Sequence, residues 1–322
     1  MAILQNTNCN SKEQIIGSFP PFSDPRSIEG MIIGNDLDSL MSACLLKKHF
    51  NWDILGIYDL TRIWHGLPLL ELTEKILNNK IVAIDLDIYH LEIPSVGHHI
   101  LTMTSRDTIP GHVKTLNPNL IRGIHNSQFP RKYPLGTIHF LLWLLDETPQ
   151  MSDSTRDLTW LVDSSYINGQ THRYRSNVGE WINVYFNDPA FRQHFEAIDT
   201  LEFENRIKTL IDAIALTGIA VSRGQVESNH LRLRGGQCQI KNPNLEYEKV
   251  VKVFDLISEI TGWSVPGFPI HYNVINGIRT SSSLTDTVTN NRLDSFLREN
   301  LVFSYVLPGQ GKINYTSGIS FP

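Results

Sequence analysis

Two aspartates follow an apolar run near the start of the chain. Residues 31–33 are apolar, Asp36 and Asp38 come next, and a helical pattern begins after them. Ligands in open α/β sheets gather at the carboxyl ends of strands. Two carboxylates at such a point can hold a hard cation through oxygen. The alternative is an Asp-rich turn that caps the helix, with Asp38 or Ser39 as the N-cap residue.

A second apolar run also ends in carboxylates. Residues 81–84 are followed by Asp85 and Asp87. Parallel strands of one sheet bring their carboxyl ends to the same edge, so we expect Asp36, Asp38 and Asp85 to converge. Their mutual repulsion would be costly without a cation to neutralise it. The pattern therefore predicts a metal ion.

A histidine pair, His98-His99, follows Asp85 after a short interval. Neutral imidazole suits manganese, iron or zinc better than magnesium or calcium, so histidine beside carboxylates favours a transition metal. His90 is a nearby alternative ligand. The alternative for the pair is two partly exposed histidines in a turn.

A fourth candidate is Asp163, which ends the apolar run at residues 160–162 and is followed by two serines. It could extend the set of carboxylate ligands. The alternative is a helix terminus with an incidental aspartate.

The elements that must position these residues alternate between strands and helices. The predicted buried strands are residues 31–33, 54–58 and 81–84. The predicted helices between them are residues 40–50 and 69–77, the second with Pro68 at its start. Buried strands separated by helices are typical of a parallel α/β sheet. Residues 1–28, with three prolines, are expected to form an irregular lead-in.

The rest of the chain predicts more helices and a few short strands. The expected helices are residues 137–145, apolar all round and deeply buried, then 156–162, 190–217 and 247–260. The expected strands are residues 271–278 and 302–307. We therefore predict an α/β protein with a parallel-sheet N-terminal domain (1–190), a linking helix (191–225) and a smaller α+β C-terminal domain (226–322).

Charge and cysteine content limit the classes of partner. The 28 Lys plus Arg against 33 Asp plus Glu give a net charge of −5, so no global basic field attracts long duplex nucleic acid. Three scattered cysteines predict neither a disulfide framework nor a zinc knuckle. With no export signal and no long apolar run, we expect a cytoplasmic protein without a membrane partner.

The four motifs, in this order, resemble those of the DHH-family phosphoesterases. That family has a D-x-D motif, a lone Asp after a later strand, an Asp-His-His triplet, and a fourth Asp beyond a buried helix. The corresponding residues here are Asp36-Leu37-Asp38, Asp85, Gly97-His98-His99 and Asp163. Residues 133–137 and the apolar helix after them also resemble the family's segment between the third and fourth motifs. The resemblance covers roughly residues 30–170, about half the chain.

The resemblance implies a metal centre and a reaction. The implied ligands of Mn²⁺, most simply as a pair of ions and with Mg²⁺ as an alternative, are Asp36, Asp38, Asp85, His98 and Asp163. His99 would support a ligand or contact a phosphate. No histidine shortly precedes the D-x-D motif, which favours the branch of RecJ-type exonucleases and oligonucleotide phosphodiesterases over the pyrophosphatase-like branch.

Three departures from the family pattern are evident. Gly97 replaces the aspartate of the triplet, the interval from Asp85 to His98 is short, and no Gly-Gly-Gly-His sequence follows. Loss of the triplet carboxylate could lower metal affinity. A catalytically decayed DHH-like binding or scaffold subunit is therefore the alternative to an enzyme.

Cations in the second half could hold a phosphate substrate. Arg279 and Ser281 lie in a segment that loosely resembles the family's Arg-Ser substrate-binding strand, and Arg232 and Arg234 stand beside two glycines. Guanidinium groups and hydroxyls suit phosphate oxygens. The alternative is a surface strand and a solvated turn. The expected activity is metal-dependent hydrolysis of phosphodiesters in short or single-stranded nucleic acid or a small nucleotide.

Overall fold

The computed structural model describes residues 11–171, 175–219, 228–233, 238–284, 293–309 and 311–321. The chain forms two compact units that interleave along the sequence. The first, here called the sheet unit, comprises Met1–Gly34, Trp52–Lys132 and Gly267–Pro322. The second, the helical unit, comprises Asn35–Asn51 and Tyr133–Pro266. All the strands that the structure describes belong to the sheet unit.

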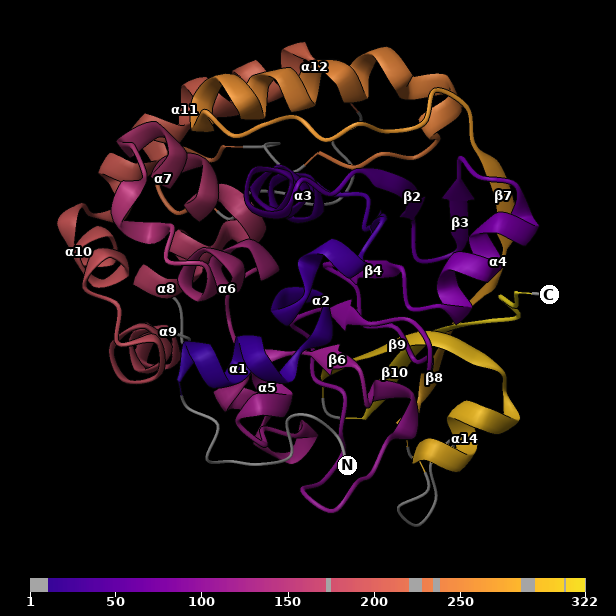
Figure 1. Ribbon diagram of the computed structural model, residues 1–322. Helices are drawn as coiled ribbons and strands as arrows, with labels where there is room; N and C mark the ends of the chain where they lie inside the picture. Colours follow the sequence, from indigo (N-terminus) through magenta and orange to yellow (C-terminus); the bar gives the residue numbers. More distant parts are fainter. Residues whose placement is uncertain are drawn as a thin grey trace. The chain divides into compact units, whose positions relative to one another are not determined.

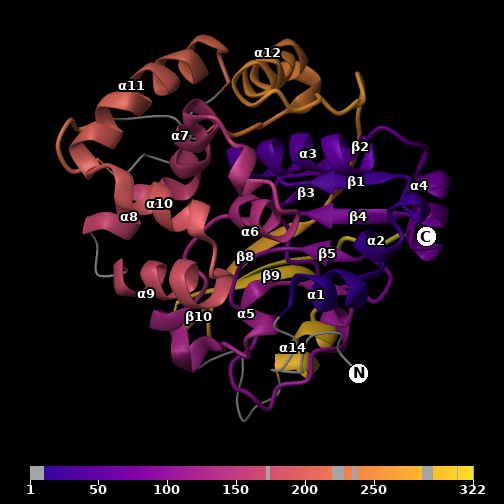
Figure 2. The ribbon, with the colours of Figure 1, turned by 60° about the vertical axis from the view of Figure 1, so that its left-hand side comes forward.

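The main sheet has seven strands in the order β6-β5-β4-β1-β2-β3-β7 (Figure 1). Their bounds are Gly30–Ile33 (β1), Ile54–Tyr58 (β2), Arg62–His65 (β3), Ile81–Ile84 (β4), Ser95–Val96 (β5), Thr115–Leu116 (β6) and Asn273–Asn276 (β7). Strands β1, β2, β4, β5 and β6 pair in parallel, and Figure 2 shows β1, β4 and β5 side by side. Strand β3 is antiparallel to β2 and β7. The predicted α/β class with a mainly parallel sheet is confirmed.

The central strands are buried on both faces, as their uninterrupted apolar sequences require. One face packs against helix α4 (Leu69–Leu77), whose Leu72 and Ile76 join a core cluster with Ile32 and Ile81. Phe303 from the C-terminal segment belongs to the same cluster. The end of the chain is therefore part of this core.

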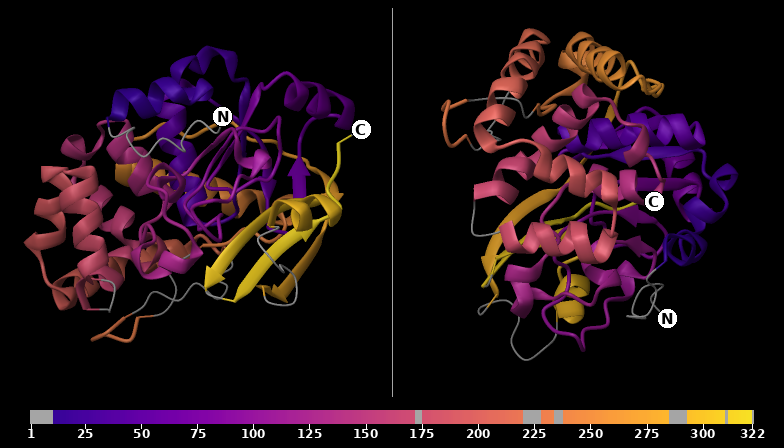
Figure 3. Two further views of the ribbon diagram at one scale, coloured as in Figure 1. Left: turned by 90° about the horizontal axis from the view of Figure 1, so that it is seen from below. Right: turned by 90° about the vertical axis from the view of Figure 1, so that its left-hand side faces the viewer.

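A separate three-stranded antiparallel sheet has the order β8-β10-β9 (Figure 3, left). Its strands are Ile278–Ser283 (β8), Val302–Gly309 (β9) and Lys312–Ser317 (β10), with helix α14 (Leu293–Glu299) before β9. The sheet is anchored within its unit because the Tyr58 hydroxyl lies 2.6 Å from Ser304 Oγ. The Tyr89 N–H also donates to the carbonyl of Phe303 at 2.7 Å.

The expectation of an irregular lead-in is wrong for residues 12–23. These residues form helices α1 (Lys12–Ser18) and α2 (Pro20–Ser23). A capping box between Ser11 and Gln14 starts α1, and Pro20 stands in the first turn of α2, where a missing N–H is tolerated. Buried apolar side chains on both helices stabilise them.

The regular structure of the described part of the helical unit is mainly α-helical. Its α-helices are Leu37–Phe50 (α3), Thr137–Leu144 (α6), Asp153–Leu161 (α7), Ser165–Thr171 (α8), Arg175–Glu180 (α9), Pro189–Ala197 (α10), Thr200–Leu216 (α11) and Pro243–Thr261 (α12), and the π-helix Trp181–Phe186 follows α9. Helix α6 is buried along its whole length, as predicted, and packs against α3. Helices α11 and α12 lie side by side (Figures 1 and 2).

The compact units differ from the division into residues 1–190, 191–225 and 226–322. Residues 267–322 pack with the strands of the first half of the chain. Helix α11, in the expected linking segment, packs against α7, α8 and α12. Within the described ranges, none of the helices is long and apolar enough to cross a lipid bilayer.

Candidate functional site

Asp85 stands at the carboxyl edge of the main sheet. It follows β4 directly and has a left-handed backbone, with φ of 58°. Ile84 pairs with Ile33 of β1, so the two parallel strands end together. Asp36 follows Ile33 by three residues along the chain. The order of strands thus brings Asp85 to the edge at which β1 ends.

His98 lies beside Asp85. Strand β5 pairs with β4 in parallel, Val96 opposite Ile84, so the residues after both strands meet at one edge. His98 Nδ1 is 3.3 Å from Asp85 Oδ1, and their side chains are 14% and 6% exposed. A carboxylate oxygen and an imidazole nitrogen together form the kind of donor pair that binds transition metals.

His99 forms a second histidine–carboxylate pair, with Asp87. His99 Nδ1 lies 2.9 Å from Asp87 Oδ2, which also accepts the backbone N–H of His99 at 3.1 Å. The rings of His98 and His99 stack with centroids 4.3 Å apart. The His99 side chain is 45% exposed whereas that of Asp87 is 1% exposed. With Nδ1 bound to the carboxylate, Nε2 is the nitrogen of His99 that remains for a ligand.

Asparagines fix the backbone of this histidine pair. Asn117 Nδ2 donates to Asp87 Oδ1 at 2.9 Å and to the carbonyl of His99 at 3.0 Å. Asn119 Nδ2 donates to the carbonyl of His98 at 2.8 Å. Burial alone would raise the pKa of Asp87, but the hydrogen bond and charge of His99, the charge of His98 and the Asn117 amide lower this pKa below its ordinary value.

Sequence reasoning did not assign a role to Asp87, Asn117 or Asn119. Asp87 follows Asp85 by two residues, which was a visible signal. Asn117 followed by Pro118 is a typical helix start, and Asn117 does cap helix α5 (Pro118–Ile121). That its amide would also reach Asp87 depends on the pairing of β5 with β6, which local sequence does not specify.

Asp36 and Asp38 have different structural roles in the helical unit. Asp36 is the N-cap of α3, and its Oδ1 accepts the Ser39 N–H at 3.1 Å. The capping alternative is thus realised by Asp36, and not by Asp38 or Ser39 as that alternative named. Asp38 is 1% exposed and accepts backbone N–H groups of Thr137 at 2.7 Å and Ile138 at 2.8 Å. These amides begin α6, where the helix dipole favours a negative charge.

Asp163 is exposed and has a left-handed backbone, with φ of 52°. It lies in the 3₁₀ turn Val162–Ser164, which packs against α3. The pKa of Tyr133 is raised, mainly by burial and further by the charges of Asp38 and Asp163. The helical unit carries Asp36, Asp38 and Asp163, and the sheet unit carries Asp85, His98 and His99.

His90, the alternative ligand, is engaged in its own loop. Its Nδ1 accepts the N–H of Glu92 at 3.1 Å, and its ring contacts Phe321. Burial lowers its pKa, against the charge of Glu92. No carboxylate pairs with His90 among the described residues in the way that Asp85 and Asp87 face the histidine pair.

The expected phosphate contacts lie in both units. Arg279 is half-buried on β8, and its Nη1 donates to Thr316 Oγ1 at 3.2 Å. Burial lowers its pKa, opposed by Tyr58. Ser281 is exposed two residues further on, hence on the same face of the strand. Arg232 is exposed in the helical unit, and Arg234 lies outside the described residues.

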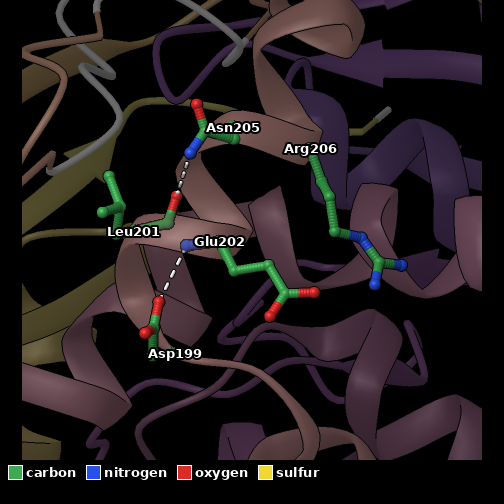
Figure 4. A pocket seen from close by; sticks show the side chains of 5 residues that line it. All are labelled: Asp199, Leu201, Glu202, Asn205 and Arg206. Atoms are coloured by element: carbon green, nitrogen blue, oxygen red, sulfur yellow. Dashed lines mark hydrogen bonds between the residues drawn. The ribbon is translucent and has the colours of Figure 1, made fainter.

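The helical unit has a surface hollow that lies apart from the predicted ligand and phosphate-binding residues (Figure 4). Its volume is about 410 Å³, and it is lined by Asp199, Leu201, Glu202, Asn205 and Arg206 at the start of α11. Asp199 caps this helix by accepting the Glu202 N–H at 2.8 Å. The hollow contains none of the predicted ligand residues.

Comparison with protein-family models, with curated proteins and with solved structures finds no match to this chain.

Proposed function

We propose that this protein is a divalent-metal-dependent hydrolase of phosphodiester bonds in short or single-stranded nucleic acid or a small nucleotide. The observation that carries the proposal is the stacked pair His98 and His99, in which each Nδ1 faces a carboxylate at the carboxyl edge of the sheet. Histidine with an oriented carboxylate partner is typical of metal sites and of general acid–base catalysis.

The proposed metal ligands are Asp36, Asp38, Asp85, His98 and Asp163. Four carboxylates and one imidazole suit Mn²⁺, since the imidazole disfavours Mg²⁺ without excluding it. A pair of such ions would lower the pKa of an attacking water and stabilise the leaving oxygen of the phosphodiester.

The chain's own residues have distinct tasks in this proposal. Two amides at the start of α6 hold the Asp38 carboxylate in one orientation. Asp87 fixes the ring of His99, so that Nε2 can contact a phosphate oxygen. No nucleophilic side chain is required, because water is the nucleophile.

Arg279 is the proposed phosphate contact at a distance from the reacting bond. Its guanidinium makes one hydrogen bond, to Thr316, and no ion pair with a carboxylate of the described residues. Further donors are therefore left for a phosphate oxygen. Ser281 on the same face of β8 can add a hydroxyl, and Arg232 and Arg234 are the second choice. A local cation is needed because the chain has a net charge of −5.

The proposed location is the cytoplasm. Cys44 and Cys238 are free and buried, and burial raises the pKa of both thiols. Buried free thiols are compatible with a reducing compartment.

Turnover of labelled short DNA and RNA oligonucleotides, with and without Mn²⁺, tests the proposal. We expect Mn²⁺-dependent cleavage that is lost in Asp38→Ala and retained in Asp212→Ala, which removes an exposed carboxylate of α11. Binding of oligonucleotides without any cleavage at saturating Mn²⁺ would instead support the catalytically decayed binding or scaffold subunit.

A further inference from the structure

Gly97 is a glycine for reasons of space. The φ angle of Gly97 is not positive, so the backbone does not require a glycine at this position. A Cβ added at position 97 would lie 2.2 Å from Asp87 Oδ1 and 2.6 Å from Asp87 Cγ. Both distances are far shorter than van der Waals contact. The Asp87 carboxylate therefore fills the volume that a side chain at position 97 would need.

Asp87 cannot easily move away to make room. Its side chain is 1% exposed, and both of its oxygens accept hydrogen bonds. Oδ2 accepts hydrogen bonds from the backbone N–H and the ring Nδ1–H of His99. Oδ1 accepts a hydrogen bond from Asn117 Nδ2. A displaced carboxylate would leave the buried side-chain amide of Asn117 without one of its acceptors, which is costly.

We propose that Asp87 takes the place of the carboxylate that the Asp-His-His resemblance expects at position 97, and that it is a positioning residue for His99. The inference rests on the proposed function for the chemistry that His99 performs. Gly97 is then a glycine because it leaves room for the Asp87 carboxylate. On this account, the glycine at position 97 does not mean that the site has lost its function.

The replacement of a carboxylate at position 97 by the carboxylate of Asp87 has a chemical consequence for His99. A neutral imidazole that donates Nδ1–H to a carboxylate keeps its lone pair on Nε2. Asp87 therefore fixes both the orientation and the tautomer of the ring. His98 is supported separately, by Asp85 at its Nδ1 and by Asn119 at its carbonyl. Loss of Asp87 should thus affect His99 while leaving Asp85 and His98 as metal ligands.

The first test uses Asp87→Asn, which preserves the shape but loses the charge. Long-range ¹H–¹⁵N spectra of protein labelled at histidine, with His99 assigned by its loss in His99→Gln, should show the Nδ1–H tautomer in the parent chain. In Asp87→Asn we expect a mixture of tautomers, kcat/KM lowered roughly 10–100-fold, and unchanged Mn²⁺ affinity. The double variant Asp87→Asn/His99→Gln should be no slower than His99→Gln, because both changes act through one ring.

The second test exchanges the two side chains. Gly97→Asp should lower the thermal midpoint because its Cβ meets Asp87. Asp87→Gly/Gly97→Asp should recover part of the midpoint and part of the turnover. Gly17→Ala is the matched control, since a Cβ there has no atom within 4 Å and the midpoint should not fall.

The outcomes separate this inference from the proposed function. An Nε2–H tautomer of His99 in the parent chain, or Gly97→Asp as stable as the parent, would overturn the inference whether or not the protein hydrolyses phosphodiesters. Absence of turnover in the parent chain, together with the expected tautomer and midpoints, would overturn the proposed function and leave the carboxylate exchange standing.

Discussion

The Oδ2 atom of Asp38 accepts the backbone N–H of Thr137 at 2.7 Å, across 99 residues of sequence. This bond joins the first turn of α3 to the first turn of α6. A carboxylate that satisfies helix amides is stabilising by itself, so the proposed metal-ligand role of Asp38 would be added to a structural one. Variants of Asp38 must therefore be read for stability and turnover together.

Asp38→Asn is expected to lower both the free energy of unfolding and the Mn²⁺-dependent turnover. The asparagine oxygen can accept one of the two amides, but its NH₂ group would face the other, at a cost of about 1–3 kcal/mol in the free energy of unfolding. Mn²⁺-dependent turnover should be abolished even in the folded fraction. Urea denaturation and oligonucleotide cleavage measure the two effects, with Asp212→Asn as the exposed control. Parent-like turnover of the folded variant would exclude Asp38 as a ligand.

Gly136→Ala tests the packing around the same carboxylate. An added Cβ would lie 2.5 Å from Asp38 Oδ2 and 3.0 Å from Val162 Cγ1. We expect a loss of about 1–3 kcal/mol in unfolding free energy from this overpacking. Gly179→Ala in α9 is the matched change, because its Cβ would have only one atom at 4.0 Å. Equal stabilities of the two variants would show that the space around Asp38 is less tight than described.

Arg279→Ala is expected to raise KM with little change in kcat. Its guanidinium would hold a phosphate away from the reacting bond, so its loss removes binding that is equal in the ground state and the transition state. Arg279→Lys should recover only part of the affinity, because an ammonium lacks the two-pronged geometry. Lys312→Ala, at the exposed start of β10, serves as the control for general charge. An unaltered KM in Arg279→Ala would place substrate binding elsewhere.

Glu204 should make the free energy of unfolding depend on pH in a way unrelated to the proposed metal ligands. Burial alone would raise its pKa, but backbone N–H groups of Leu231, Asn229 and His230 and the Ser228 hydroxyl lower it below the ordinary 4.5. Its contribution is therefore complete above pH 4.5 and is lost as the pH falls through the folded-state pKa.

The measurement is the free energy of unfolding of Glu204→Gln at neutral and acidic pH. The variant should be less stable than the parent at about pH 7, and the difference should shrink near about pH 4. Glu196→Gln, an exposed position on α10, should show no such difference. A deficit of Glu204→Gln that is constant with pH would contradict the assigned pKa direction.

The central part of the fold was predictable from local sequence. Strands β2 and β4 have the predicted bounds because two-sided burial requires unbroken apolar runs. Helix α4 has them because a proline is tolerated at the start of a helix but not in its interior, so that Pro68 marks where the helix begins. Strand β10 was missed, since the sequence Lys312–Ser317 is largely polar. It is specified by its pairing with β8 and β9, which is a long-range property.

The sequence indicated which aspartates and histidines were candidate ligands, but it did not indicate which side chains would contact them. The apolar runs before Asp36 and Asp85 predicted that these carboxylates would converge at one sheet edge, and the histidine pair was a ligand candidate because it follows Asp85 closely. Strand β5, which brings His98 to that edge, was not predicted. The pairing of Asp87 with His99 depends on the space at Gly97 and on the loop that supplies Asn117. Such contacts depend on three segments at once, and no single stretch of sequence contains that information.

The most direct test of the central claim is anomalous diffraction at the manganese edge from crystals grown with Mn²⁺. The proposal predicts an anomalous peak coordinated by Asp85 and His98 together with carboxylates from Asp36, Asp38 and Asp163. No peak at these side chains under saturating Mn²⁺ would contradict the claim that this protein is a metal-dependent phosphodiesterase.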